Sequence, residues 1–375
     1  MSDLLKRAVG GPGALLLPGA LVLLALPFYA TGFWLQSGLF AMAAVIGAVG
    51  LSLLTGTTGQ LSLGHAFFLA VGAYGYVWFS GRPGGTGPAR LTGLGLPPLL
   101  AFVLAVALAG AAGGLLSPIA GRLRGMYLGV ATLALVFIGQ HVMLNAHAVT
   151  GGYNGRSVAP MELFGFALAD GSPSGLLVLG VPFGGLERLW YFGLALVAIA
   201  LLTARNLLRG RPGLALGAVR DSEVAAAVMG VPVARYRSAA FVVSCLYAGA
   251  GGALLALVFR RVVPETFGLV LSIDYLAMIV IGGLGSVGGA AAAAVLVTLL
   301  PQVLTGYADD LPLLAPAGSG SAGPTPGEAA RYLYGAAIVL VLTLAPQGLA
   351  GLARRRPRPA RTTLTTLDTP QEQTP

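Results

Sequence analysis

The chain has 375 residues, of which 56% are hydrophobic and only 9% are charged, and its mean hydropathy is +0.84. This composition excludes a soluble globular protein and indicates that most of the surface faces lipid. The formal net charge is +9, but the basic residues lie between apolar runs and form no single patch that would suit nucleic acid. The numerous glycines and prolines lie inside the apolar runs, where small residues let helices pack closely.

The apolar runs are roughly 20 residues long, which suits transmembrane helices and not the roughly 10-residue strands of a barrel. The sequence therefore predicts an all-α, polytopic transmembrane helical bundle of about ten spans, within a range of roughly eight to ten. The hairpin at 271–306 is short for two crossings, so one of its pieces is open to being re-entrant or broken. The predicted spans are 13–30, 36–55, 61–80, 96–117, 126–145, 188–205, 238–259, 271–287, 289–306 and 332–351.

The first apolar run follows Lys6 and Arg7 and resembles a secretory signal. No clear small-x-small cleavage site follows it, and further spans do, so we predict that it is retained as the first span. Most basic residues fall in segments that are cytoplasmic if the N-terminus is inside, as the positive-inside rule requires. Both termini are then predicted to be cytoplasmic, which requires an even number of spans.

We predict a single transmembrane domain over residues 1–352. Its long loops are predicted at 146–187 and 307–331 outside and at 206–237 inside. Residues 353–375 begin with arginines and continue with Thr, Pro and Gln, which predicts a basic and then disordered cytoplasmic tail.

The inner loop contains a short helix with punctuation at both ends. Asp221 or Ser222 can cap its start, Glu223 favours the positive end of the helix dipole, and Gly230 followed by Pro232 ends it. One face is apolar, so the helix either rests on lipid headgroups or enters a groove of a partner protein. The apolar residues on that face are Val224, Ala227 and Val228.

Two polar or glycine-rich stretches interrupt the apolar runs, at 55–64 and 282–289. Each is either a tight turn between spans or a discontinuity within the membrane whose polar groups line a pathway, and the sequence leaves both alternatives open. Thr132 is a weaker pathway candidate, with Gln140 and Asn145, because isolated polar residues also join helices. The candidate pathway residues are Gln60, Ser62, His65, Thr132, Gly282, Gly285 and Ser286.

Catalytic and metal-binding patterns are absent from the sequence. Cys245 is the single cysteine, and the histidines at 65, 141 and 147 lack the i, i+4 metal spacing, so we predict no metal site. The spans hold few ionisable groups of the kind that ion-driven carriers retain, with Asp274 near a span end. No Ser/His/Asp or Asp/Asp arrangement favours a membrane enzyme.

Six segments together resemble one family. In the inner loop, Glu223, Ala225, Ala226 and Gly230 match the Glu-Ala-Ala-then-Gly pattern of the coupling segment of ABC importer permeases. More closely, the chain resembles the membrane subunits of branched-chain amino acid importers, the LivM-type permeases. The matching segments are GQLSLGHAF at 59–67, RLRGMYLGVATLA at 122–134, TGGYNG at 150–155, AVRDSE at 218–223, GGLGS at 282–286 and PQGL at 346–349.

The resemblance implies a permease subunit of an ATP-driven importer in the inner membrane of a prokaryote. Its expected partners are a second homologous permease, two cytoplasmic ATPases and an extracytoplasmic solute-binding protein. The only lysine, Lys6, has no P-loop context, so the chain is expected to bind no cofactor and to leave ATP and Mg to the ATPases. The resemblance assigns ATPase coupling to Arg220, Asp221, Glu223, Ala225, Ala226 and Gly230.

Branched-chain amino acids are the expected cargo, with urea or short amides as the alternative, and a stand-alone carrier or channel as the alternative of another class. The sequence departs from the family at Phe137, where members commonly have an acidic residue, and at Ala290, where a proline often follows the glycine. Both departures weaken a transfer of substrate contacts, and neither touches the inner loop.

Overall fold

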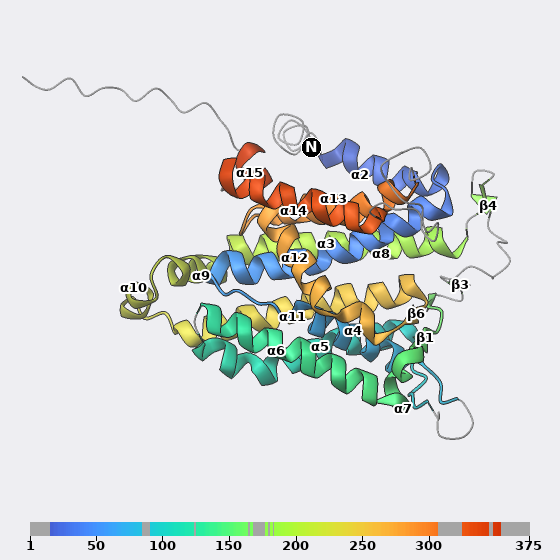
Figure 1. Ribbon diagram of the computed structural model, residues 1–375, viewed down its shortest axis with the longest axis horizontal. Helices are drawn as coiled ribbons and strands as arrows, with labels where there is room; N and C mark the ends of the chain where they lie inside the picture. The colour runs from blue at the N-terminus through green and yellow to red at the C-terminus, as the bar shows by residue number, and fades with distance from the viewer. Residues whose placement is uncertain are drawn as a thin grey trace, which may run out of the picture.

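The computed structural model describes residues 16–84, 91–123, 125–163, 166–167, 177–178, 181–182, 184–306, 325–344 and 348–353. Helices dominate this part of the chain and lie side by side in one bundle (Figure 1). The helical membrane protein predicted from the apolar runs is confirmed. The predicted loop 307–331 up to residue 324, and the tail from residue 354, lie outside the described residues.

Each predicted span overlaps a longer helix of the bundle; the first span also includes η1 (Leu26–Phe28) and the last also reaches into α15 (Gly348–Ala353). These helices are α2 (Leu16–Ala25), α3 (Gly32–Thr58), α4 (His65–Ser80), α5 (Pro98–Arg122), α6 (Met126–Asn145), α8 (Gly185–Arg209), α11 (Val233–Phe259), α12 (Leu269–Gly282), α13 (Val287–Gly306) and α14 (Pro326–Leu344). Within the described part of the chain, six of them are long and apolar enough to cross a membrane, namely α3, α5, α6, α8, α11 and α13.

The centre of the bundle is formed by α3, α11 and the shorter α4, most of whose residues are buried. In their most apolar stretches, α3 is 89% buried and α11 is 72% buried, whereas α5, α6, α8 and α13 are between 17% and 33% buried and therefore form its outside. Small residues allow the close approach of the central helices: a side chain at Gly252 of α11 would collide with the backbone of Leu69 in α4. Such contacts are typical of helices that pack in lipid.

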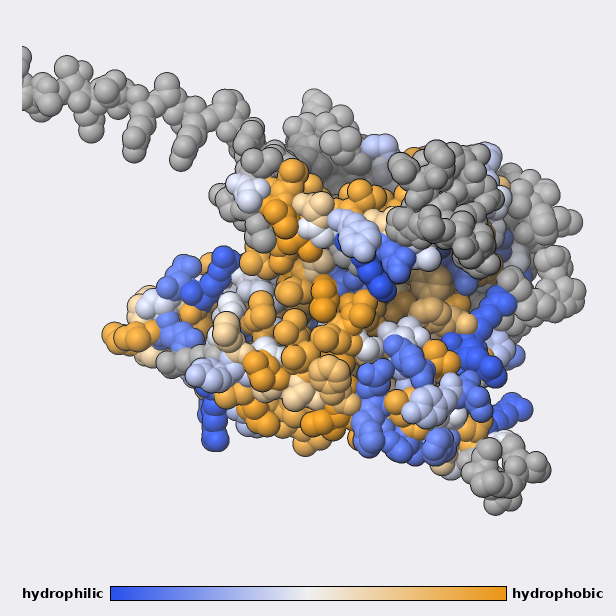
Figure 2. Space-filling view, in the orientation of Figure 1, coloured by the Kyte–Doolittle hydropathy of each residue, from blue (hydrophilic) through white to orange (hydrophobic). Residues whose placement is uncertain are grey.

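The two ends of the bundle differ in structure. Helices α9 (Arg211–Asp221) and α10 (Glu223–Val228) lie at one end, and the strands and α7 (His147–Thr150) lie at the other (Figure 1). Figure 2 shows a broad hydrophobic surface between them, with hydrophilic residues gathered toward both ends. This pattern fits a molecule whose helices run across the bilayer.

Short elements build the end opposite α10. β1 (Arg156–Ser157) pairs antiparallel with β6 (Arg261–Val262), so the loop after α6 is tied to the end of α11. Arg156 is 3% exposed and donates hydrogen bonds to the carbonyls of Thr92 and Val149. Burial lowers the pKa of the Arg156 guanidinium from its ordinary value.

The remaining elements are η3 (Gly152–Asn154), β2 (Glu162–Leu163), β3 (Phe166–Ala167), β4 (Leu177–Val178), β5 (Val181–Pro182) and η4 (Pro264–Phe267).

Several helix bounds differ from the prediction, and two of the differences lie at the interrupted segments. α4 begins at His65 and not at 61, because residues 59–64 are not helical. α12 ends at Gly282 and not at 287, because Gly283 and Gly285 take the positive φ angles of 97° and 81°. The inner loop also contains α9, which was not predicted because Gly213 and Gly217 disfavour a helix; Pro212 lies in the first turn, where proline is tolerated.

Candidate coupling and translocation site

The short helix predicted in the inner loop is present as α10. Ser222 caps it, its hydroxyl accepting a hydrogen bond from the backbone N–H of Ala225 at 3.2 Å, and Gly230 follows it with a φ of 85°. The face predicted to be apolar points outward: Val224 is 76% exposed and Val228 is 84% exposed. Figure 2 shows hydrophobic surface at the tip where α10 lies. The tip is therefore available to a partner or to headgroups.

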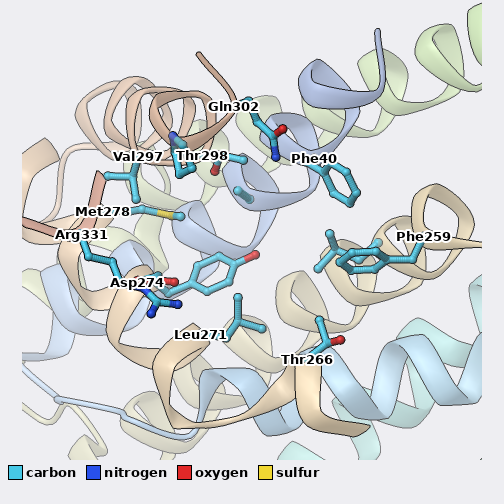
Figure 3. A pocket seen from close by; sticks show the side chains of 14 residues that line it. Phe40, Phe259, Thr266, Leu271, Asp274, Met278, Val297, Thr298, Gln302 and Arg331 are labelled. Carbon is cyan, nitrogen blue, oxygen red and sulfur yellow. The ribbon is translucent and has the colours of Figure 1, made fainter. Parts of the chain in front are cut away.

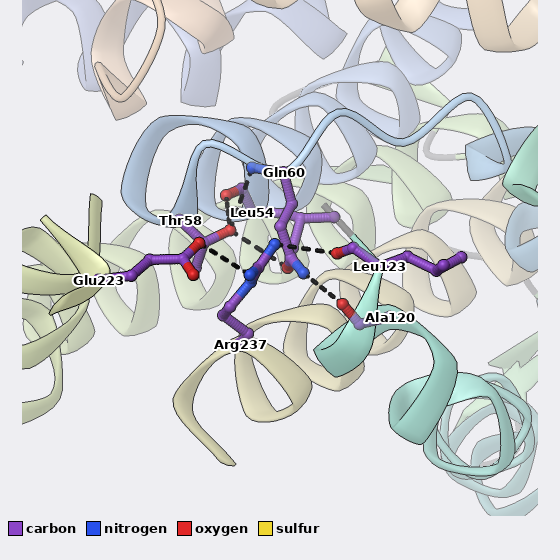
Figure 4. Close-up of polar contacts among 7 residues, drawn as sticks. All are labelled: Leu54, Thr58, Gln60, Ala120, Leu123, Glu223 and Arg237. Carbon is purple, nitrogen blue, oxygen red and sulfur yellow. Dashed lines mark hydrogen bonds and ion pairs between the residues drawn. The ribbon is translucent and has the colours of Figure 1, made fainter. Parts of the chain in front are cut away.

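An ion pair between Glu223 and Arg237 connects α10 to the bundle. Oε1 of the Glu223 carboxylate accepts from Nη1 of Arg237 at 2.8 Å, and Nη2 of Arg237 donates to the carbonyl of Leu123 at 3.0 Å (Figure 4). The side chain of Arg237 is 4% exposed and that of Glu223 is 31% exposed. The pair joins α10 to the start of α11 and to the end of α5.

Arg220 makes a second connection between the inner loop and the bundle. From the last turn of α9, its Nη1 donates to the carbonyl of Gly56 in α3 at 2.7 Å. Gly56 in turn packs against the backbone of Gly285, closely enough that a side chain there would collide. Of the other predicted coupling residues, Asp221 and Ala225 are exposed and Ala226 is buried.

Gln60 stands at the start of the non-helical segment 59–64. Its side chain is 1% exposed and donates from Nε2 to the carbonyl of Ala120 at 2.6 Å, while Thr58 donates to its Oε1 at 3.2 Å (Figure 4). Ala120 lies one turn before Leu123, which accepts from Arg237. The end of α5 thus contacts both Gln60, a predicted pathway residue, and Arg237, which pairs with Glu223 of α10.

The segment 59–64 runs back into the bundle as non-helical chain. The N–H of Leu63 donates to Oγ1 of Thr132 in α6 at 3.0 Å, and the N–H of Ala66 donates to Oγ of Ser272 in α12 at 3.1 Å. Side chains from two other helices therefore satisfy backbone groups that would otherwise lack a partner at membrane depth. Ser62 is 3% exposed in the same packing.

His65 lies well inside the bundle. Its ring packs on Tyr275 with centroids 5.0 Å apart, and Tyr275 also touches Gly47, about three turns before the end of α3. α4 consequently begins about 16 Å deeper than the point where α3 ends. This geometry favours a discontinuity within the bundle over a tight turn at its end. His65 itself is 2% exposed and faces helices of its own chain.

The second predicted interruption, 282–289, forms a tight hairpin between α12 and α13. Gly282 and Gly289 touch so closely that a side chain on either would collide with the carbonyl of the other. Ser286 accepts from the N–H of Gly289 at 3.1 Å and so helps to start α13. The hairpin lies against the end of α3, near Arg220.

The structure thus brings Gln60 and the 282–289 hairpin close to the coupling residues at one end of the bundle, whereas His65 lies deeper inside it. Sequence reasoning missed Arg237, which it treated only as one inside charge among many, and Ser272, which carries no motif. Across the described residues, no group of three or more His, Cys, Asp or Glu side chains could hold a metal ion.

The long apolar helices and the broad hydrophobic surface define a multi-pass helical membrane protein. A family model for the permease component of branched-chain amino acid transport systems matches residues 34–342, and the chain belongs to this family. It is thus a permease component of a membrane transport system.

Two relatives are similar over most of the chain. The high-affinity branched-chain amino acid transport system permease protein LivM of Salmonella typhimurium is 30% identical over 342 residues, which cover 89% of this chain and 73% of the relative. The LivM protein of Escherichia coli is 30% identical over 346 residues, covering 89% of this chain and 74% of the relative. No solved structure matches the chain.

Proposed function

We propose that this chain is the permease subunit of an ATP-binding-cassette importer that carries branched-chain, aliphatic amino acids. Together with a second homologous permease it forms the translocation pathway. An extracytoplasmic solute-binding protein delivers the cargo, and two cytoplasmic ATPases supply the energy. The observation that carries this proposal is the similarity to the two LivM proteins, which extends over 89% of the chain.

The inner loop supports the docking of an ATPase. α10 exposes an apolar face with Val224 and Val228, while Glu223 on its other side is tied to Arg237. A partner that displaces α10 would therefore also move the helices that it contacts. These are α11 and α5, through the Glu223–Arg237 pair, and α3, through Arg220. These contacts fit a coupling helix that enters a groove of a partner.

The proposed setting is the cytoplasmic membrane of a prokaryote, with both termini and the α9–α10 loop inside. Residues 1–352 form the permease domain in this proposal and 353–375 the cytoplasmic tail. The chain itself binds no cofactor; ATP and Mg bind to the ATPases.

Reconstitution tests the proposal. The chain is purified together with a second permease, two ATPases and a solute-binding protein of the same organism, placed in liposomes and supplied with labelled L-leucine. ATP-dependent uptake of leucine is expected. ATP-dependent uptake of labelled urea but not of leucine would show that urea is the cargo. Uptake driven by an ion gradient, with this chain alone in the liposomes, would contradict the proposal that it belongs to an ATP-driven importer.

A further inference from the structure

A cavity of about 350 Å³ lies in the bundle between α3, α11, α12, α13 and α14. Thr266 of η4 and Phe259, the last residue of α11, help to line it, so it lies near β6 and toward the end opposite α10. In the proposed orientation this is the extracytoplasmic side, where a binding protein releases its solute. Its volume is at the lower end of the range for small-molecule sites.

The cavity holds one acidic and one basic side chain in a mainly apolar lining. Asp274 and Arg331 contribute the charges, and Phe40 and Phe259 contribute apolar surface. Figure 3 shows Asp274 and Arg331 at one side of the cavity and the two phenylalanines at the other. Charged side chains on membrane helices are costly, so their presence in a cavity marks a functional site.

Local structure fixes the two charges. Asp274 is in the second turn of α12, two residues after Ser272, whose hydroxyl accepts from the backbone of α4. Arg331 is in the second turn of α14, and the first turn is set by Thr325 and Glu328: the N–H and hydroxyl of Thr325 both donate to Oε2 of Glu328 at 2.9 Å. The charged pair is thus placed by two separate helix starts.

Thr298 of α13 adds a polar residue to the lining of the cavity. Its Oγ1 is buried, and within the described part of the chain it has no hydrogen-bond partner. A buried hydroxyl without a partner is unfavourable unless a ligand satisfies it. A polar ligand in this space would offer that hydroxyl a partner.

We propose that this cavity binds the cargo as an α-amino acid zwitterion, with Asp274 facing the ammonium group and Arg331 facing the carboxylate. Carboxylates accept from ammonium groups, and guanidinium groups bind carboxylates in a planar, two-pronged manner. Because the two protein charges cancel and the two ligand charges cancel, binding adds no net charge to the membrane interior. The apolar side of the cavity receives the aliphatic side chain.

This inference rests on the proposed function and narrows it. Urea carries neither an ammonium group nor a carboxylate, so the charged pair would offer it no advantage. Asp274 already has an interaction within the chain in this conformation, so the ligand competes for the carboxylate. Weak, exchangeable binding suits a site on a transport pathway, which has to release its cargo.

The test measures protection of a cysteine in the cavity. Leu271, which lines the cavity, is replaced in the full chain (Leu271→Cys), and labelling by a water-soluble thiol reagent is followed in membrane vesicles. The native Cys245 is buried and contributes little background. The probes are L-leucine, isocaproate, which lacks the amino group, and isopentylamine, which lacks the carboxylate.

L-leucine is expected to protect the reporter cysteine at a concentration at least about tenfold lower than either analogue, because each analogue loses one charge-assisted contact. Asp274→Asn and Arg331→Gln are each expected to weaken protection by leucine about tenfold. Glu265→Gln and Arg261→Gln are matched controls, because both residues are exposed and neither lines the cavity. The controls should leave protection unchanged.

Equal protection by all three probes would overturn the inference, and so would variants of Asp274 and Arg331 that behave like the controls. The analogue series needs only the reporter chain, so it decides the matter even where a charge variant fails to fold. Leucine uptake in the reconstituted importer is measured separately. Uptake without protection overturns the cavity site alone, whereas protection without ATP-dependent uptake overturns the importer and leaves the site.

Discussion

Arg237 shows how one side chain can join two functional regions. It is almost fully buried, carries a charge, and bridges Glu223 of α10 and Leu123 at the end of α5. Removing one partner of such a pair leaves the other charge poorly solvated, which costs more than the pair itself contributes. The ion pair therefore holds α10 in place more than it stabilises the fold.

Glu223→Gln and Arg237→Gln are expected to lower ATPase co-purification and leucine uptake, with a loss of about 1–3 kcal/mol in the attachment of α10. The double variant should lose less than the sum of the two single variants, because each single change already breaks the same contact. The measurement is the amount of ATPase that co-purifies with the wild type, with each single variant and with the double variant. Strictly additive losses would show that the two residues act separately.

The sequence alone could identify Glu223 but not its partner. Glu223 belongs to a local pattern with Ser222 and Gly230, and local patterns are visible along the chain. Arg237 is fourteen residues away and meets Glu223 only because α11 starts beside the end of α5. Its sequence neighbourhood shows a cytoplasmic arginine and nothing more.

At the scale of elements, α10 depends on the conformation of the residue that ends the inner-loop helix. Gly230 has a φ of 85°, which an L-residue adopts at a cost of about 1–2 kcal/mol. Gly230→Val should leave the protein inserted but lower ATPase association. Gly217→Ala in α9 is the matched control, because it has open space around it and lies in a helix. Equal ATPase association in the two variants would contradict the prediction.

The hairpin between α12 and α13 offers a sharper pair of neighbours. A side chain at Gly289 would collide with the carbonyl of Gly282, whereas one at Gly288 meets nothing nearby. Gly289→Val is therefore expected to lower the melting temperature of the detergent-solubilised protein by several degrees, for a cost of roughly 1–3 kcal/mol. Gly288→Ala should melt like the wild type. A thermal melt of both variants decides, and loss in neither would show that the hairpin adapts.

The position of the helices followed from hydropathy, but the break before α4 did not. Apolar runs of about the right length mark spans wherever lipid is the solvent. The stretch 59–64 was equally compatible with a turn at the surface, because its glycines and polar residues suit both. The deciding contacts come from distant helices: the hydroxyl of Thr132 accepts from the N–H of Leu63 in this segment, and the hydroxyl of Ser272 accepts from the N–H of Ala66 in the first turn of α4. α9 escaped prediction for the opposite reason, since tertiary contacts override the poor helix propensity of its first turns.

At the scale of the whole molecule, the orientation depends on how many times the chain crosses. α4 and α12 have 16 and 14 residues, so they rise about 24 and 21 Å, less than the roughly 30 Å of the hydrocarbon core. Helix length alone therefore does not fix the parity. Other chain precedes each short helix and adds to its length: the non-helical residues 59–64 before α4 and the 3-10 helix η4 before α12.

If all ten segments cross, both ends of the chain lie on the α10 side. Green fluorescent protein fused after residue 375 should then fluoresce, and alkaline phosphatase inserted at residue 316, in the predicted outer loop, should be active because its disulfides form only outside the cytoplasm. Exchanging the two reporters should silence both. Active alkaline phosphatase at the C-terminus would contradict the prediction, because it would require an odd number of crossings. It would also place the C-terminus outside, although α15 packs beside Gly283 at the end of α12 on the α10 side. The contact between α15 and Gly283 places the end of the described chain beside the 282–289 hairpin, which lies near Arg220. A reporter at the C-terminus therefore also shows on which side of the membrane the coupling loop lies.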